Sequence, residues 1–166
     1  MAENDKKKMD GGKDLFKPTL LYIDDEAHNL VSFKAVFRRD FIVNTAISVD
    51  EAKPFLTDPN LCIIVSDQRM PGTTGVEFFA KIKETHPNPI RILLTGYSDI
   101  EAVIDAINKG EVYRYLTKPW DESFMKSVLN QALEIYNLRK ENKQLVADLK
   151  RANEQLEFYL RQKLLS

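Results

Sequence analysis

Residues 63–75 read IIVSDQRMPGTTG and join a strand-like run to a carboxylate. Residues 63–66 have the character of a buried strand, and they lead directly into Asp67. A proline and two glycines follow Asp67 and break the backbone pattern at once. Open α/β sheets bind ligands at the carboxyl ends of their strands. The stretch therefore predicts that Asp67 takes part in chemistry and that the loop after it shapes a pocket.

The same alternation of strand and helix extends over residues 19–135. Helical patterns follow each of five strand-like segments, which are TLLYID (19–24), FIVNTA (41–46), LCIIVSD (61–67), PIRILLT (89–95) and VYRYLT (112–117). Parallel strands need crossover connections, and right-handed crossovers put helices on both faces of the sheet. The pattern predicts an α/β fold with a doubly wound parallel sheet, and the most apolar segment, 61–67, belongs at its centre.

Local signals place several helix ends. Ser48 and Ser98 each precede a glutamate by three residues, so each predicts a capping box that opens a helix. Pro54 should kink or shorten the helix that Ser48 begins. Gly110 should end the helix over residues 99–109. Asp121 should start a last helix, for which the chain shows no stop signal.

Composition narrows the classes of protein. Hydrophobic residues make up 43%, charged residues 30%, and the net charge is −1, which favours a soluble protein without a basic field for nucleic acid or anionic membranes. No apolar run reaches the ~20 residues that span a bilayer. The single cysteine, Cys62, is expected to fill the core, which fits a reducing, cytoplasmic location. Residues 1–17 mix lysines with acids and predict a disordered leader rather than a basic arm.

Charged and hydroxyl side chains follow four of the five strands, and the fold would bring them to one edge of the sheet. They are Asp24 and Asp25, Asp67, Thr95, and Lys118. Three neighbouring carboxylates repel one another, and a hard cation such as Mg²⁺ relieves this. A lysine and a hydroxyl suit phosphate oxygens, and a carboxylate can form an acyl phosphate. Each residue alone has an ordinary alternative as a helix cap or a surface side chain; their joint placement favours a phosphoryl-transfer pocket.

Four segments carry a family resemblance: YIDDE (22–26), SDQRMPGTTG (66–75), LLTGYSD (93–99) and YRYLTKPW (113–120). With these four segments in this order, the chain resembles the receiver domain of bacterial two-component response regulators. The resemblance implies a flavodoxin-like sheet with strand order 2-1-3-4-5. It also implies a signalling role rather than an enzyme with its own substrate, with phosphorylation by a histidine kinase or a phosphotransfer protein.

The resemblance also implies a role for each residue of the acidic pocket. Asp67 would be the phosphoacceptor. Asp25, Asp67 and the backbone carbonyl of Arg69 would be direct Mg²⁺ ligands, and Asp24 would act through a coordinated water.

Other residues would respond to the phosphoryl group. Thr95 and Lys118 would bind its oxygens, and Tyr115 would rotate inward as Thr95 moves. The output surface would be the face formed by the fourth helix, fifth strand and fifth helix. The bulky side chains of Arg69 and Tyr97 would shield the acyl phosphate from water, which predicts slow self-hydrolysis.

Beyond the receiver, placed at residues 18–135, the tail 136–166 predicts a coiled coil that continues the last helix. One heptad register carries nearly all apolar residues at its core positions: a at Ile135, Asn142, Leu149, Leu156 and Lys163, and d at Leu138, Leu145, Ala152 and Tyr159. Asn142 at an a position favours a parallel homodimer in fixed register. The alternative is a long helix that folds back on its own domain or frays.

The sequence is compatible with three alternative functions. The first is a phosphorylation-controlled receiver that signals through a dimeric tail to an output. The second is a receiver-like dimerisation scaffold that phosphate does not control; the complete pocket argues against it. The third is a phosphohydrolase or nucleotide enzyme, which the absence of a GxxxxGK[ST] loop disfavours. These residues contain no basic helix of the kind that would indicate nucleic-acid binding.

Overall fold

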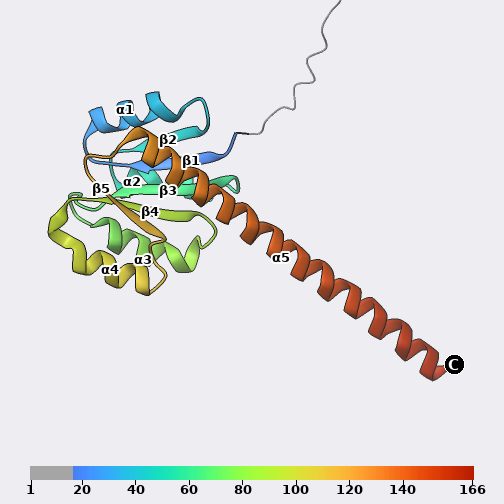
Figure 1. The fold of residues 1–166 in the computed structure, drawn as a ribbon. Coiled ribbons are helices and arrows are strands. Elements are labelled where there is room, and N and C mark those ends of the chain that lie inside the picture. Colours follow the sequence, from blue (N-terminus) through green and yellow to red (C-terminus); the bar gives the residue numbers. More distant parts are fainter. Residues whose placement is uncertain (1–16) are drawn as a thin grey trace, which may run out of the picture.

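The computed structural model describes residues 17–166, so that all but the last residue of the predicted leader lies outside the described part. Five parallel strands form one sheet in the order β2-β1-β3-β4-β5, as Figure 1 shows. The strands are β1 (Thr19–Ile23), β2 (Ile42–Ala46), β3 (Leu61–Asp67), β4 (Ile90–Thr95) and β5 (Arg114–Thr117). The expected strand order and the central place of residues 61–67 are both confirmed.

Helices cover both faces of this sheet. They are α1 (Ala27–Phe37), α2 (Val49–Ala52) with the 3₁₀ turn η1 (Lys53–Thr57), α3 (Gly75–Thr85), η2 (Tyr97–Asp99), α4 (Ile100–Asn108) and α5 (Glu122–Leu165). One core cluster joins the sheet to α1 and α5, and the other joins it to α2, α3 and α4. Alternate residues of β1 enter opposite clusters, Leu20 and Tyr22 one and Leu21 and Ile23 the other. This period of two is what a strand buried on both faces requires.

Most of the predicted helix signals are confirmed. Ser48 caps α2 as its hydroxyl accepts from the Glu51 amide at 3.1 Å, but the Glu51 carboxylate accepts from the Ile47 amide, so the reciprocal half of the predicted capping box is not formed. Helix α2 gives way to the 3₁₀ turn η1 at Lys53, next to Pro54. Gly110 follows the end of α4 with a φ of +73°, a left-handed conformation that glycine adopts without a Cβ penalty.

The capping box predicted at Ser98 and Glu101 is wrong. Helix α4 starts at Ile100 with Asp99 at its N-cap position, and neither the Ser98 nor the Asp99 side chain caps it. The Ser98 hydroxyl instead accepts a hydrogen bond from the Arg69 guanidinium. Ser98, which the local sequence predicts as a cap, therefore makes a tertiary contact instead.

Helix α5 has two parts that differ in burial. Its buried residues end at Tyr136, and every residue from position 137 onward is exposed. In Figure 1 this second part extends well away from the sheet as one continuous helix. The proposed division at residues 135 and 136 stays a prediction. Among residues 17–166, no helix is both long and apolar enough to cross a membrane.

Gly75 fixes how closely α3 approaches the end of β3. A Cβ at this position would lie 2.6 Å from the Asp67 carbonyl oxygen and 2.6 Å from Leu93 Cδ1. The first of these atoms belongs to the backbone, so it cannot yield by rotation of a side chain. The first turn of α3 can therefore pack beside Asp67 only without a side chain at residue 75.

We expect Gly75→Ala to lower the free energy of unfolding by about 1–3 kcal/mol, because a backbone shift must relieve the contact with Asp67. Gly96→Ala is the matched control, since a Cβ there meets nothing within 4 Å and its φ is −78°; its effect should stay within about 0.5 kcal/mol. Urea unfolding of both variants measures the difference. Equal stability of the two would contradict the tight contact.

Candidate functional site

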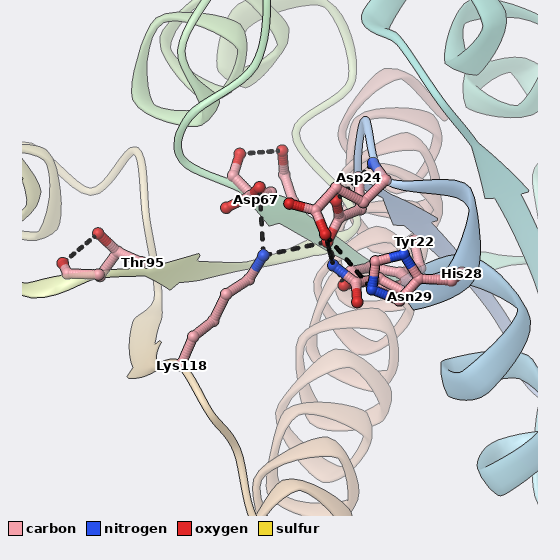
Figure 2. A network of polar contacts seen from close by, with 10 residues as sticks. Tyr22, Asp24, His28, Asn29, Asp67, Thr95 and Lys118 are labelled. Atoms are coloured by element: carbon pink, nitrogen blue, oxygen red, sulfur yellow. Dashed lines mark hydrogen bonds and ion pairs between the residues drawn. The ribbon is translucent and has the colours of Figure 1, made fainter.

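The carboxyl ends of β1, β3 and β5 meet in one charged cluster, which Figure 2 shows from close by. The Lys118 ammonium lies 3.1 Å from Asp24 Oδ2 and 3.2 Å from Asp67 Oδ2. These residues are far apart in sequence, and the parallel sheet brings them together because its strand ends share one edge. The predicted convergence of these three strand ends is thus present in the fold.

Asp24 is the most enclosed group of the cluster. Its carboxylate is fully buried and accepts hydrogen bonds from the Tyr22 hydroxyl at 2.7 Å, the Glu26 amide at 3.0 Å, Asn29 Nδ2 at 3.1 Å and Lys118. Burial alone would raise the pKa of this carboxyl, but these donors outweigh burial and hold the pKa below its ordinary value. Asp24 is therefore a permanent anion at neutral pH.

Tyr22 and Asn29 are site residues that the sequence analysis missed. Tyr22 precedes Asp24 by two positions, and the period of two along a strand gives both side chains the same face. That spacing was a usable signal. Asn29 lies in the first turn of α1, where only the fold brings its amide to Asp24.

Asp67 has the opposite electrostatic balance. Burial raises the pKa of its carboxyl and the Asp24 charge adds to this, while the Lys118 ammonium opposes both; the net pKa is raised. Burial by itself lowers the pKa of Lys118, yet the two carboxylates reverse this and leave it raised. The lysine therefore stays charged, and Asp67 is the carboxylate on which negative charge is less well compensated.

The cluster has the oxygen ligands and the negative charge for a cation. Oxygens of Asp24, Asp25 and Asp67 all lie within 4.8 Å of one another, and Asp25 is exposed. One ammonium cannot neutralise three carboxylates. A hard divalent ion that keeps part of its water shell suits such a half-open set of oxygen ligands. The residues thus fit Mg²⁺ as the predicted ligand.

Thr95 adjoins the cluster, but its hydroxyl does not point into it. The Thr95 carbonyl accepts from the Lys118 amide at 3.0 Å, which joins the ends of β4 and β5. The Thr95 hydroxyl is buried and donates to the Gly96 carbonyl at 2.7 Å, away from Lys118 in Figure 2. Tyr115 is partly buried against the core on the α3 and α4 side of the sheet.

The loop after Asp67 is anchored on both sides. Gln68 is buried, and its side-chain oxygen accepts from the Val76 amide at 2.9 Å, which orients the start of α3. The Arg69 guanidinium reaches across to the loop after β4, with Nε 3.2 Å from Asp99 Oδ2. From the sequence, the Arg69 carbonyl is expected to bind Mg²⁺ and its side chain to shield the acyl phosphate, but the contacts of that side chain with Asp99 and Ser98 are not expected.

We expect Tyr22→Phe to raise the pKa of Asp24 and to lower the free energy of unfolding at pH 7 by about 1–3 kcal/mol, because a buried anion loses a donor. A lowered folded-state pKa stabilises the fold above the unfolded pKa of about 4, and this contribution is lost as the pH falls through the folded pKa. The difference between variant and wild type should therefore vanish at low pH.

Carboxyl NMR titration and urea unfolding across pH test this. Tyr113→Phe is the control, because it removes the hydroxyl of a partly buried tyrosine that packs against the same core cluster. An unchanged Asp24 pKa in Tyr22→Phe would show that the hydrogen bond contributes nothing.

Comparisons with known proteins agree with this geometry. The family model of the response regulator receiver domain matches residues 20–130. The hydrogenase transcriptional regulatory protein HoxA of Cupriavidus necator is 34% identical over 148 residues, which cover 89% of this chain and 31% of that protein. The chain thus spans less than a third of the length of this relative.

Solved structures show the same fold. A chain described as adenylate cyclase from Rhodopirellula baltica superposes with a TM-score of 0.75 at 31% identity and covers 78% of this chain and 97% of its own. A response regulator receiver domain protein from Clostridium thermocellum gives a TM-score of 0.69 at 29% identity, with 73% and 98% covered. With the match over residues 20–130, these likenesses show that the chain belongs to the response regulator receiver family.

Proposed function

We propose that this chain is a phosphorylation-controlled receiver module in which Asp67 accepts the phosphoryl group. The observation that carries the proposal is the Lys118 ammonium held between Asp24 and Asp67 at the edge of the sheet. Asp24 is the better stabilised anion, which leaves Asp67 as the carboxylate available to react. The phosphoryl donor would be a histidine kinase or a phosphotransfer protein in the cytoplasm.

Mg²⁺ would be held by Asp25, Asp67 and the backbone carbonyl of Arg69, with Asp24 bound through a water. When bound, the ion neutralises charge on the transferring phosphoryl group. The proximity of the three carboxylates supports this ligand set. Because Asp24 is saturated with protein donors, an indirect role suits it better than direct coordination.

In the transfer step, an Asp67 carboxylate oxygen attacks phosphorus. A new P–O bond forms as the bond to the donor breaks, and the donor leaves with that electron pair. Lys118 stabilises the negative oxygens throughout, since its ammonium already lies 3.2 Å from Asp67. Because the acceptor and Lys118 are both in this chain, it takes part in its own phosphorylation. It would also take part in its own dephosphorylation, in which water attacks phosphorus, the P–O bond to Asp67 breaks, and the carboxylate and inorganic phosphate are released.

The switch that would follow involves Thr95 and Tyr115. To bind a phosphoryl oxygen, Thr95 must give up its 2.7 Å hydrogen bond to the Gly96 carbonyl. The phosphoryl group adds about −1.5 to −2 charges. This charge attracts the hydroxyl proton, and Tyr115 would then turn into the space that Thr95 leaves.

We expect a single phosphoryl adduct on the intact protein after incubation with Mg²⁺ and acetyl phosphate, measured by mass spectrometry. The adduct should be lost in Asp67→Asn, because the amide is not a competent nucleophile. It should persist in Asp148→Asn, which alters an exposed carboxylate of the tail. An adduct in Asp67→Asn, or none in the folded wild type, would refute Asp67 as the acceptor and favour the scaffold alternative.

We propose further that the tail forms a parallel two-stranded coiled coil. Its expected core positions Leu138, Leu145, Leu149, Leu156 and Tyr159 are 57–66% exposed in the single chain. So many large apolar side chains on a helix beyond the domain favour a partner helix. The first a position, Ile135, instead packs partly against the receiver core and would join the two parts.

We expect Leu149→Lys with Leu156→Lys to convert a dimer into a monomer, because each subunit would place two charges in the helix seam. Ala147→Lys is the matched control, since its f position faces solvent in this register. Analytical ultracentrifugation measures the dissociation constant, and a monomeric wild type would contradict the coiled coil. Measured with and without phosphorylation, an unchanged dimer affinity and helix spacing would argue against relay of the signal through the tail.

A further inference from the structure

Helix α4 begins without a side-chain cap although two residues that commonly act as caps precede it. Its N-cap Asp99 makes no capping hydrogen bond, and Ser98 makes none either. In contrast, Ser48, Thr74 and Asp121 each cap the helix that follows them. The residue types before α4 are therefore suitable, but Asp99 has a φ of −119° and a ψ of 27° instead of the extended backbone of those three caps. Its side chain and that of Ser98 make another contact.

That contact is the Arg69 guanidinium. Its Nε lies 3.2 Å from Asp99 Oδ2 and its Nη2 donates to Ser98 Oγ at 2.5 Å. One side chain from the loop after β3 thus contacts one oxygen of each of the two residues that could cap α4 and holds both side chains toward itself. The guanidinium is mostly exposed, with 71% of the Arg69 side chain accessible, and exposed ion pairs are weak. Helix capping by serine or aspartate contributes at least as much.

We propose that Arg69 is a positioning residue that withholds the α4 cap, and that a phosphoryl group on Asp67 releases it. This step rests on the proposed phosphorylation of Asp67. Arg69 is two residues from the acceptor, and the phosphoryl oxygens offer a guanidinium a stronger anionic partner than a single exposed carboxylate does. Once Arg69 turns to them, Asp99 or Ser98 accepts from the amides of Glu101 or Ala102 and α4 gains its cap.

The segment that Arg69 would release, residues 96–99, lies between Thr95 and α4, so the change of cap affects how these two are connected. Gly96 and η2 (Tyr97–Asp99) connect Thr95 to α4 without interruption. Thr95 must break its bond to the Gly96 carbonyl to reach the phosphoryl group, and Arg69 holds the other end of the same segment. Both restraints on residues 96–99 are therefore removed by one event at Asp67.

Amide hydrogen exchange at Glu101 and Ala102, followed by NMR on the full chain, tests the proposal. In the unphosphorylated protein, Arg69→Ala should slow exchange at one or both amides several-fold, because the freed cap now accepts from them. The triple variant Arg69→Ala, Ser98→Ala, Asp99→Ala should lose this protection. Arg161→Ala, which removes an exposed arginine of the tail, should leave both amides unchanged.

A second arm uses Mg²⁺ and beryllofluoride as the phosphoryl mimic on wild-type protein, with binding verified by fluorine NMR. Bound beryllofluoride should slow hydrogen exchange at the same two amides of the wild type. In Arg69→Ala, where this exchange is already slow, beryllofluoride should change it little. Unchanged or faster exchange in Arg69→Ala would overturn the cap exchange. Protection in Arg69→Ala without protection in beryllofluoride-bound wild type would overturn its control by the phosphoryl group.

The two arms separate this inference from the proposed function. Failure of beryllofluoride to bind would count against Asp67 as the acceptor. The Arg69→Ala arm needs no phosphoryl group and decides the cap exchange in either case.

Discussion

The ammonium of Lys118, held between the carboxylates of Asp24 and Asp67, is the interaction on which the rest of the site depends. Without it, Asp24 and Asp67 would face each other as neighbouring anions at the edge of a low-dielectric core. Tyr22, Asn29 and the Glu26 amide compensate Asp24. Lys118 is shared, so its charge is available to a group that arrives at Asp67. The negative charge is thus least well compensated at Asp67, which is the proposed phosphoacceptor.

This concentration of charge is possible because the sheet is apolar almost everywhere else. Both faces of β1, β3 and β4 are buried, and their side chains divide between two core clusters. Polar groups can then be placed only where the strands end. Gly75 lets α3 start directly against the Asp67 carbonyl, so the loop that closes the pocket stays short. Core packing and site geometry are thus fixed by the same few residues.

Strand order, the central strand and the residues at the strand ends followed from the sequence, because each rests on a short periodic pattern or on a family motif. The direction of the Thr95 hydroxyl, the Gln68 contact with α3 and the Arg69 bridge did not. These depend on distances between loops that are separate in sequence. Ser98 shows the physical reason: local preference predicts it as a cap, but its hydroxyl oxygen accepts a hydrogen bond from a guanidinium of another loop instead.

The pocket and the tail are joined by a short piece of chain. Lys118 is three residues from Asp121, whose side chain caps α5 through the Phe124 amide at 3.0 Å. Trp120 lies between them and packs against Phe33, which in turn lies against Tyr22, with ring centroids 5.8 and 4.2 Å apart. Tyr22 donates to Asp24, so this aromatic row starts at the acidic cluster and ends at Trp120, directly before the N-cap of α5. Because α5 is a single helix from Glu122 to Leu165, a rotation imposed at its first turn changes the direction in which the apolar residues of the tail face.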